Sequence, residues 1–216
     1  MITLKKDEKR MITVFMDADS SNRHSGEETD SRIDSGQARM TDRRLDVILA
    51  GENASVEVVG LVLAKNQDEK SIEANIVHAA PNTKSNVNIR SVLRDRSTFA
   101  FRGNVKIEKG AKGADAYLRS DALLFDEAKM GDDTPALEIL EPDVKAGHAA
   151  TIGKVDEEMI FYLMSRGLTR DQSEKMIISG FIEPIRNVIL GSEATPESNN
   201  TDSGQARMTN RKKNES

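Results

Sequence analysis

The chain has 216 residues, and its 31 Lys and Arg against 36 Asp and Glu give a formal net charge of −5, which provides no global positive field for nucleic acid. The absence of Cys excludes disulfides, thiol nucleophiles and any zinc or iron–sulfur site held by this chain's own thiolates. With no apolar run of signal-peptide or membrane-spanning length, the sequence predicts a cytoplasmic protein without a membrane or nucleic-acid partner.

Both ends of the chain are strongly polar, so the core must come from the middle. Residues 1–44 contain one short apolar stretch, from Ile12 to Met16, followed by a run rich in Ser, Asp, Arg and Gly. Such a run cannot bury enough apolar surface to order itself. The tail, residues 191–216, has no hydrophobic period of either kind. We expect the tail and most of residues 1–44 to be disordered.

The two polar ends share an octapeptide. DSGQARMT occurs at residues 34–41 and again at 202–209, each time followed one residue later by Arg. A structural repeat recurs at a fixed period and builds a stack, whereas these two copies lie far apart and outside the apolar region. Two hypotheses stay open: a trace of repeated DNA flanking a gene fragment, or a duplicated recognition tag in disordered arms.

Between residues 45 and 145 the pattern changes to short segments with period-two alternation, which predicts strands. Small residues predict the corners, where a chain that turns repeatedly needs positive φ or close approach. An antiparallel sandwich and a parallel β-helix both fit, and the lack of Asn-Gly or Asp-Gly hairpin turns favours the β-helix. The clearest strand positions are Val56, Val58, Leu61, Leu63, Ile72, Ala74, Ile76, Val87, Ile89, Phe99, Phe101, Val105, Ile107, Leu137 and Ile139, and the predicted corners include Gly51, Ala54, Gly60, Gly103, Gly110, Gly113 and Ala114.

From Asp156 the period becomes helical. Asp156 is the predicted N-cap of a first helix, which ends after Arg166 at Gly167, and the segment 169–172 fits a capping box for a second helix. Each helix is too short to be stable alone, so the pair must pack on the β region, on itself or on another protein. The apolar positions are Met159, Ile160, Leu163 and Met164 in the first helix and Met176, Ile177 and Phe181 in the second. For the Met residues, core packing is favoured over an adaptable contact surface.

Seven blocks of this sequence, in order, resemble a known family. They are LAGENASVEVVGLVLA (49–64), HAAPNTKSN (78–86), FRGNVKIEKGAKGADA (101–116), LRSDALLFDEA (118–128), PALEIL (135–140), HAATIGKVDEEMIFYLMSRGL (148–168) and MIISGF (176–181). Together they are similar to the C-terminal half of the SufB/SufD proteins, the paired β-helix components of the SUF iron–sulfur cluster assembly machine. The block that begins with HAATIG is more similar to SufD than to SufB.

The resemblance implies a truncated right-handed parallel β-helix over residues 45–147 and a helical subdomain over residues 148–190. It implies a non-enzymatic assembly component that pairs with a SufB-type subunit or with a second copy of a like subunit. In the family the helical subdomain docks the SufC ATPase. No cofactor is expected to stay bound, although an iron–sulfur cluster can form transiently on the complex. The partner-facing candidates for a SufC-type ATPase are Met159, Phe161, Tyr162, Arg166, Met176 and Phe181.

One histidine and one missing thiol bear on metal chemistry. His148 matches the His of the SufD-like HGAT motif, and a neutral imidazole can ligate iron, although a packed turn residue is the alternative. Where the resemblance places a SufB cysteine, within LRSDALL, this chain has Ser120, and a hydroxyl cannot replace a soft thiolate ligand. His78 is interpreted as a structural corner residue. The carboxylates Asp121, Glu138 and Glu141 are interpreted as solvated charge.

Two alternatives to the assembly component stay open. The abrupt start of the coil near Leu45 and the polar ends fit a truncated remnant of a SufB/SufD protein without function, which would unfold in urea with a broad transition. An acyltransferase-like enzyme on a hexapeptide β-helix would need a six-residue period of small aliphatic residues, and residues 45–145 show none.

Overall fold

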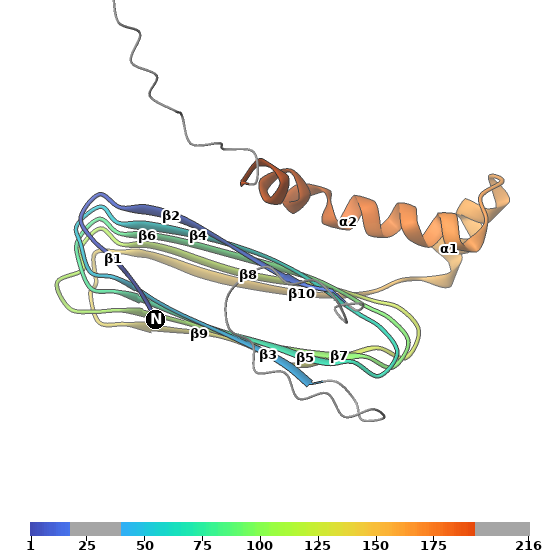
Figure 1. Cartoon of the computed structure of the whole chain (residues 1–216), viewed down its shortest axis with the longest axis horizontal. Coiled ribbons are helices and arrows are strands. Elements are labelled where there is room, and N and C mark those ends of the chain that lie inside the picture. The colour runs from blue at the N-terminus through green and yellow to red at the C-terminus, as the bar shows by residue number, and fades with distance from the viewer. Residues whose placement is uncertain (18–39, 193–216) are drawn as a thin grey trace, which may run out of the picture.

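The computed structural model describes residues 1–17 and 40–192, which form a two-layered parallel β-solenoid followed by two helices (Figure 1). Sheet A has the strand order β1-β3-β5-β7-β9, and sheet B has the order β10-β8-β6-β4-β2. The chain alternates between the sheets, so each coil consists of one strand from each. The strands are β1 (Ile2–Leu4), β2 (Lys9–Met16), β3 (Met40–Leu49), β4 (Ser55–Ala64), β5 (Glu69–His78), β6 (Lys84–Leu93), β7 (Thr98–Ile107), β8 (Asp115–Leu124), β9 (Lys129–Ile139) and β10 (Lys145–Lys154).

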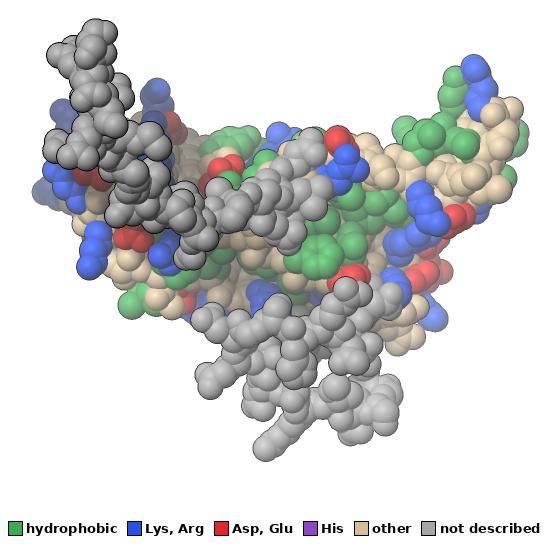
Figure 2. All heavy atoms as spheres, turned by 45° about the horizontal axis from the view of Figure 1, so that its top comes forward, with side chains coloured by type: hydrophobic (Ala, Val, Ile, Leu, Met, Phe, Trp, Pro, Cys, Tyr) green, Lys and Arg blue, Asp and Glu red, His purple; other side chains and the backbone are tan. Residues whose placement is uncertain are grey.

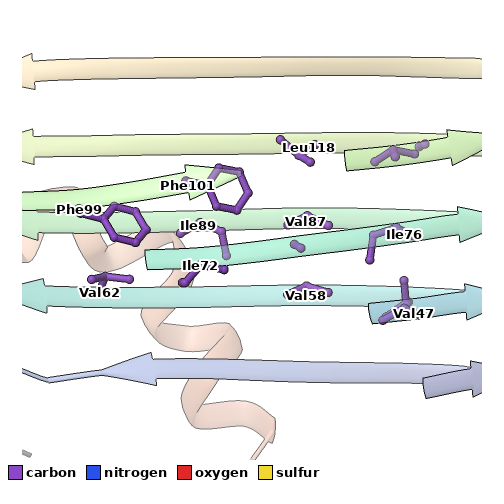
Figure 3. Close-up of a cluster of buried hydrophobic side chains, with 14 of the residues drawn as sticks. Val47, Val58, Val62, Ile72, Ile76, Val87, Ile89, Phe99, Phe101 and Leu118 are labelled. Carbon is purple, nitrogen blue, oxygen red and sulfur yellow. The ribbon is translucent and has the colours of Figure 1, made fainter. Parts of the chain in front are cut away.

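Every coil places its inward side chains over those of the next coil. In sheet A, Val47 pairs with Ile76 and Ile76 with Val105, and each step is 29 residues along the chain. All three are at most 1% exposed, and Figure 3 shows such residues of both sheets between the layers. The alternation that predicted strands is therefore the alternation between core and surface. The parallel solenoid predicted from the sequence is confirmed, and the sandwich is excluded.

The corners are built largely by Asn and Asp. Asn66, Asn82, Asp95 and Asp126 have positive φ, a conformation that these short polar side chains tolerate better than other non-glycine residues. Two predicted corner residues, Gly60 and Gly103, lie instead inside β4 and β7. They are small because a buried neighbour fills the space above them: a Cβ on Gly103 would stand 2.3 Å from a methyl carbon of Leu118.

The predicted disorder of residues 1–44 is wrong for its described part. β1 and β2 belong to the solenoid, and β3 begins at Met40 rather than near Leu45. In β2, Ile12 pairs with Val58, so this strand obtains its hydrogen bonds from a segment 46 residues later in the chain. Local composition does not reveal such a partner.

Most of the remaining predicted disorder lies outside the described residues. The residues that the structure does not describe are 18–39 and 193–216. Both copies of the octapeptide also lie outside the described residues, except for Met40 and Thr41 of the first copy, which begin β3.

The predicted boundary between the β region and the helices is also wrong. β10 extends to Lys154, so His148 lies in the last strand of the solenoid and the first helix begins at Glu157. The strand was missed because its sequence, KAGHAATIGK, is dominated by small residues rather than by large alternating apolar ones. No further described coil lies on β10, so its inward positions have little apolar surface to contact.

The two helices follow the predicted capping chemistry. α1 (Glu157–Ser165) begins at the N-cap Asp156, whose carboxylate accepts the N–H of Glu158 at 2.9 Å, and Gly167 adopts positive φ after the helix. α2 (Arg170–Ser192) begins with the predicted capping box, in which Thr169 and Gln172 bond reciprocally.

α2 lies on the outer face of sheet B, where Ile185 is buried against Val59 and Leu61 (Figure 1). Within residues 1–17 and 40–192, neither helix combines the length and the apolar character that crossing a membrane requires.

Candidate partner-binding surfaces

The last coil of the solenoid, β9 and β10, is open on one side. β9 pairs only with β7 and β10 only with β8 within the described chain. In the register of sheet B, His148 pairs with Leu118, which pairs with Val87, so all three share the inward-facing row. Leu118 and Val87 are fully buried, whereas His148 is exposed. The candidate iron ligand therefore stands at the uncovered end of the core and not in a turn.

The free edge of β10 is a complete hydrogen-bonding edge. The N–H of Lys145 donates to the carbonyl of Ala114, and the N–H of Val155 donates to that of Leu124. Because successive residues of a strand point their backbone groups to opposite sides, the even-numbered residues from 146 to 154 direct theirs away from β8. Between Lys145 and Lys154 this edge has no charged side chain, no Pro and no bulge. Such an edge is a template for another strand.

β9 offers a poorer edge than β10. The N–H of Leu140 donates to the carbonyl of Ile107, so the backbone of Pro135 faces the free side of the strand. Proline has no N–H, and the edge lacks a donor there. A register shift between Phe99 and Phe101 also marks a bulge in the β7–β9 pair. Proline and bulges both discourage strand pairing, so β10 is the better template of the two.

His148 does not belong to a metal-ligating cluster among the described residues. In the part of the chain that the structure describes, no three His, Cys, Asp or Glu side chains gather as a metal site. The other candidate carboxylates are engaged elsewhere: Glu138 lies 3.4 Å from Lys106, and Glu141 accepts the N–H of Gly110 at 3.0 Å. Iron held at His148 would need donors beyond those that the described residues gather around it.

Asp121 is not the solvated charge that the sequence predicted. It is 4% exposed on the outer face of β8 and accepts a hydrogen bond from Arg119 at 2.8 Å. Arg90 of β6 lies 3.6 Å from the same carboxylate. Asp121 is thus a buried ion-pair partner of Arg90, which in turn donates a hydrogen bond to the Phe181 carbonyl of α2.

Asp133 of the last coil and Ser120 of the coil before it form an unpredicted polar pair. Asp133 shares the inward row of sheet A with Phe101, and Ser120 of β8 is 1% exposed. Within the described chain, neither carboxylate oxygen of Asp133 nor the hydroxyl of Ser120 meets hydrogen-bond geometry with a partner. Burial raises the pKa of Asp133, and the nearby Ser120 hydroxyl offsets part of that rise. A carboxyl group in this setting destabilises the fold when it is ionised.

His78 confirms its structural interpretation. The ring is fully buried, with Nδ1 2.8 Å from the hydroxyl of Thr83 and Nε2 2.8 Å from that of Ser85. Burial lowers the pKa of His78 to about 4, and the negative charge of Asp115 opposes that change. The neutral imidazole ties the end of β5 to the start of β6.

The helical hairpin carries a second candidate surface, the hairpin patch. We use this name for the exposed side chains of Met159, Phe161, Tyr162, Met164 and Met176, which are 42% to 72% exposed. Core packing, the favoured interpretation for the Met residues of the patch, is therefore wrong. Figure 2 shows hydrophobic side chains gathered at the projecting end of the molecule, where Figure 1 places α1. Flexible Met side chains suit a contact surface that adapts to its partner.

Two further predicted partner residues differ in their setting. Arg166 is exposed beside the hairpin patch, where its guanidinium lies 5.1 Å from the ring centre of Tyr162 and donates to the Tyr162 hydroxyl at 3.0 Å. Phe181, in contrast, packs under the guanidinium of Arg90, at 5.1 Å, and is only partly exposed. Phe181 thus belongs to the contact between α2 and sheet B rather than to the open face of the hairpin.

A sequence model described as "SUF system FeS cluster assembly, SufBD core domain" matches residues 21–181. The chain belongs to the SufBD family. A SufBD family protein of Mycobacterium tuberculosis is 42% identical over 139 residues, which are 64% of this chain and 16% of that protein. SufB of Bacillus subtilis is 36% identical over 137 residues, 63% of this chain and 30% of SufB. A SufBD family protein of Staphylococcus saprophyticus is 33% identical over 147 residues, 68% of this chain and 32% of that protein.

The matched part of this SufBD chain thus spans about a third, or less, of the relatives named above. The family confirms the resemblance to SufB/SufD proteins, and with it the link to iron–sulfur cluster assembly. The closer similarity to SufD stays a prediction.

Proposed function

We propose that this SufBD chain is a SufD-like, non-enzymatic component of a cytoplasmic SUF assembly complex. It pairs through the free edge of β10 with a SufB-type subunit or a like subunit, and it presents the hairpin patch to a SufC-type ATPase. The observation that carries the proposal is the open last coil, in which a complete strand edge lies beside the only exposed histidine of the described inward rows. An iron–sulfur cluster is the cargo of such a complex and not a resident cofactor of this chain.

The free edge supports pairing with a second solenoid. A partner strand laid on β10 would satisfy the outward backbone groups of residues 146 to 154 and would cover inward side chains that are now exposed. Main-chain hydrogen bonds contribute affinity in such β-augmentation, and the small side chains of β10 allow close approach.

His148 would then be enclosed between two chains. Its imidazole can offer one nitrogen lone pair to iron, and the partner would supply donors that the described residues do not gather around it. The absence of thiols from this chain supports the SufD-like over the SufB-like role, since soft thiolates suit iron–sulfur clusters.

The hairpin patch supports docking of the ATPase. Four of the five patch residues lie on α1, which is held away from the solenoid core at the end of the molecule (Figure 1). The Tyr162–Arg166 pair adds two residue types that dominate binding energy at protein interfaces.

The docking claim is tested by co-purification and calorimetry with a SufC-type ATPase. The parent chain should bind, and Phe161→Ala should weaken binding at least tenfold, since truncating a central aromatic typically costs more than about 1.4 kcal/mol. Met11→Ala is the matched control, because Met11 is an exposed apolar residue, 44% accessible, on the distant strand β2. A parent chain that fails to bind the ATPase, or equal losses for both variants, would refute the docking claim.

The ligand role of His148 is tested on the paired complex. His148→Ala should leave pairing intact and lower the iron retained after cluster assembly, whereas His148→Gln keeps the size of the side chain without the imidazole. Unchanged iron retention in both variants would assign His148 a packing role only.

A further inference from the structure

The charged groups between the two helices and the solenoid form one connected chain. Glu157 opens α1 and accepts two hydrogen bonds from Arg170 of α2, at 2.9 and 2.6 Å. The Nε of Arg170 donates to Glu174 at 2.9 Å. Glu174 also accepts a hydrogen bond from Arg94, which follows β6. The guanidinium of Arg94 lies 5.2 Å from the ring centre of Phe125, which follows β8.

Glu174 is the central member of this chain. It is 7% exposed, and one of its carboxylate oxygens faces its own helix while the other faces the solenoid. This chain of charged groups contains two carboxylates and two guanidinium groups, so its net charge is zero. A carboxylate so enclosed between two guanidinium groups is far more costly to disrupt than an exposed ion pair, because removing one partner leaves a desolvated charge.

Two other attachments of α2 lie further along the helix. Phe181 packs under the guanidinium of Arg90 of β6, which also donates a hydrogen bond to the Phe181 carbonyl. Ile185 is buried against Val59 and Leu61, and it stands 11 residues after Glu174, or about 16 Å at the helical rise. The apolar contact of Ile185 is non-directional and lets a helix rotate or slide. The hydrogen bond from Arg90 holds the middle of α2, at Phe181. The hydrogen bonds of Glu174 have defined geometry and fix the orientation of the N-terminal half of α2.

We infer that Glu174 is a positioning residue: through Arg94 it sets the orientation of the helical hairpin on the solenoid, and through Arg170 it sets α1 against α2. The inference rests on the proposed function in one respect, since the orientation matters by aiming the hairpin patch at its partner. The residue itself is 7% exposed and lies outside the hairpin patch.

The positioning claim is tested on the free chain by distance measurements between two spin labels. The sequence contains no Cys, so Ser179→Cys on exposed α2 and Lys109→Cys at an exposed corner give two unique attachment sites. The labelled parent should give one narrow distance distribution. Glu174→Gln, which keeps the shape of the side chain and removes its charge, should broaden that distribution at least twofold.

Two further variants make the test specific. Arg94→Gln removes the same contact from the solenoid side and should broaden the distribution equally. Asp171→Asn is the matched control, since Asp171 bonds only Lys175 of its own helix at 2.6 Å in the described contacts and should leave the distribution narrow. If Glu174→Gln retains the parent width, or Asp171→Asn broadens it as much, the positioning claim is wrong.

Binding of a SufC-type ATPase separates this claim from the proposed function. If the docked orientation falls to about a tenth of the population in Glu174→Gln, the apparent affinity falls about tenfold, because only the competent fraction binds. A parent chain that does not bind the ATPase refutes the proposed function and leaves the distance result standing. A parent and a Glu174→Gln variant that bind equally well refute the positioning role in docking.

Discussion

His148 and Leu118 are neighbours in one inward-facing row of sheet B, yet Leu118 is fully buried and His148 is exposed. The difference arises because β8 is covered by a strand on each side, whereas β10 is covered on one side only within the described chain. The inward row thus ends in a histidine at the open edge of β10, where Leu118 stands in β8. Substitutions at this edge therefore test the proposed pairing directly.

Substituting proline at Ala150 should abolish strand pairing at β10 without unfolding the solenoid. The backbone of Ala150 faces the free side, as the donors of Lys145 and Val155 establish, so the lost N–H is not part of the ladder with β8. Size-exclusion chromatography with light scattering should show loss of the paired species.

The control for this substitution is Ala150→Val, which keeps the donor and should keep the pair. Pairing that survives Ala150→Pro would place the interface elsewhere on the molecule. A lowered unfolding temperature for the proline variant would instead mean that this N–H bonds β8.

Asp133→Asn should stabilise the chain at neutral pH. Burial raises the pKa of Asp133, so the folded state binds its proton more tightly than the unfolded state does, and the stability it contributes in acid is lost as the pH rises through the folded pKa. We expect the variant to gain about 1 kcal/mol at pH 7, the lower range for relieving a buried unsatisfied group.

Urea unfolding at pH 7 and at pH 4 measures this difference. The gain should shrink toward acid pH, where the parent carboxyl is protonated. A gain of equal size at both pH values would point to packing rather than charge. Asp132→Asn, at an exposed carboxylate 2.9 Å from Arg102, is a control that should give no such gain.

The buried imidazole of His78 should make the chain lose stability in mild acid. Its pKa is lowered to about 4 in the folded state, so at intermediate pH the unfolded state binds the proton that the folded state rejects. The stability contribution is fully present above the ordinary pKa of about 6.5 and falls progressively toward pH 4, by up to about 3 kcal/mol.

Denaturant unfolding between pH 7 and pH 4 should therefore show a steeper decline for the parent than for His78→Gln. Gln does not titrate in this range and retains groups able to bond Thr83 or Ser85. Parallel pH profiles for the two proteins would contradict the buried neutral imidazole.

Gly103→Ala should destabilise the chain by about 1–2 kcal/mol, in the range for overpacking a well-filled core. The added Cβ would stand 2.3 Å from a methyl carbon of Leu118 and 3.0 Å from the ring of Phe101, both fully buried. Gly153→Ala is the matched control in β10, where the nearest atom is a carbonyl oxygen at 3.9 Å. Thermal unfolding that ranks the control as equally destabilised would show that strand propensity, and not the core contact, governs the effect.

The parts of the fold that were predictable are those encoded locally. Phe99 and Phe101 alternate with polar residues within one strand, and the capping pair Thr169 and Gln172 lies within one helical turn. β2 and β10 could not be predicted in the same way. The first depends on β4, far along the chain, and the second is built of small residues at an uncovered edge.

The residues of the candidate site likewise differ in how far the local sequence predicts them. His148 was found through its motif, but its place in a strand was not, because Ala and Gly give no clear period. Asp133 faces inward only because a bulge shifts its register, and the contact of Glu174 with Arg94 joins residues 80 positions apart. Met159 is exposed because nothing in the described chain packs over that face of α1, and the local sequence pattern does not reveal this.

The coil-over-coil register has a consequence for how such chains can change length during evolution. A single insertion within a strand must be absorbed by a bulge, as in β9, or it turns every later inward side chain outward up to the next corner. A corner can absorb the same insertion. The bend between β7 and β8, residues 108–114, is two residues longer than the bend between β5 and β6, residues 79–83, while the strands on either side keep ten residues each. Homologues are therefore expected to differ by deletions and insertions at bends, or by entire turns of the solenoid.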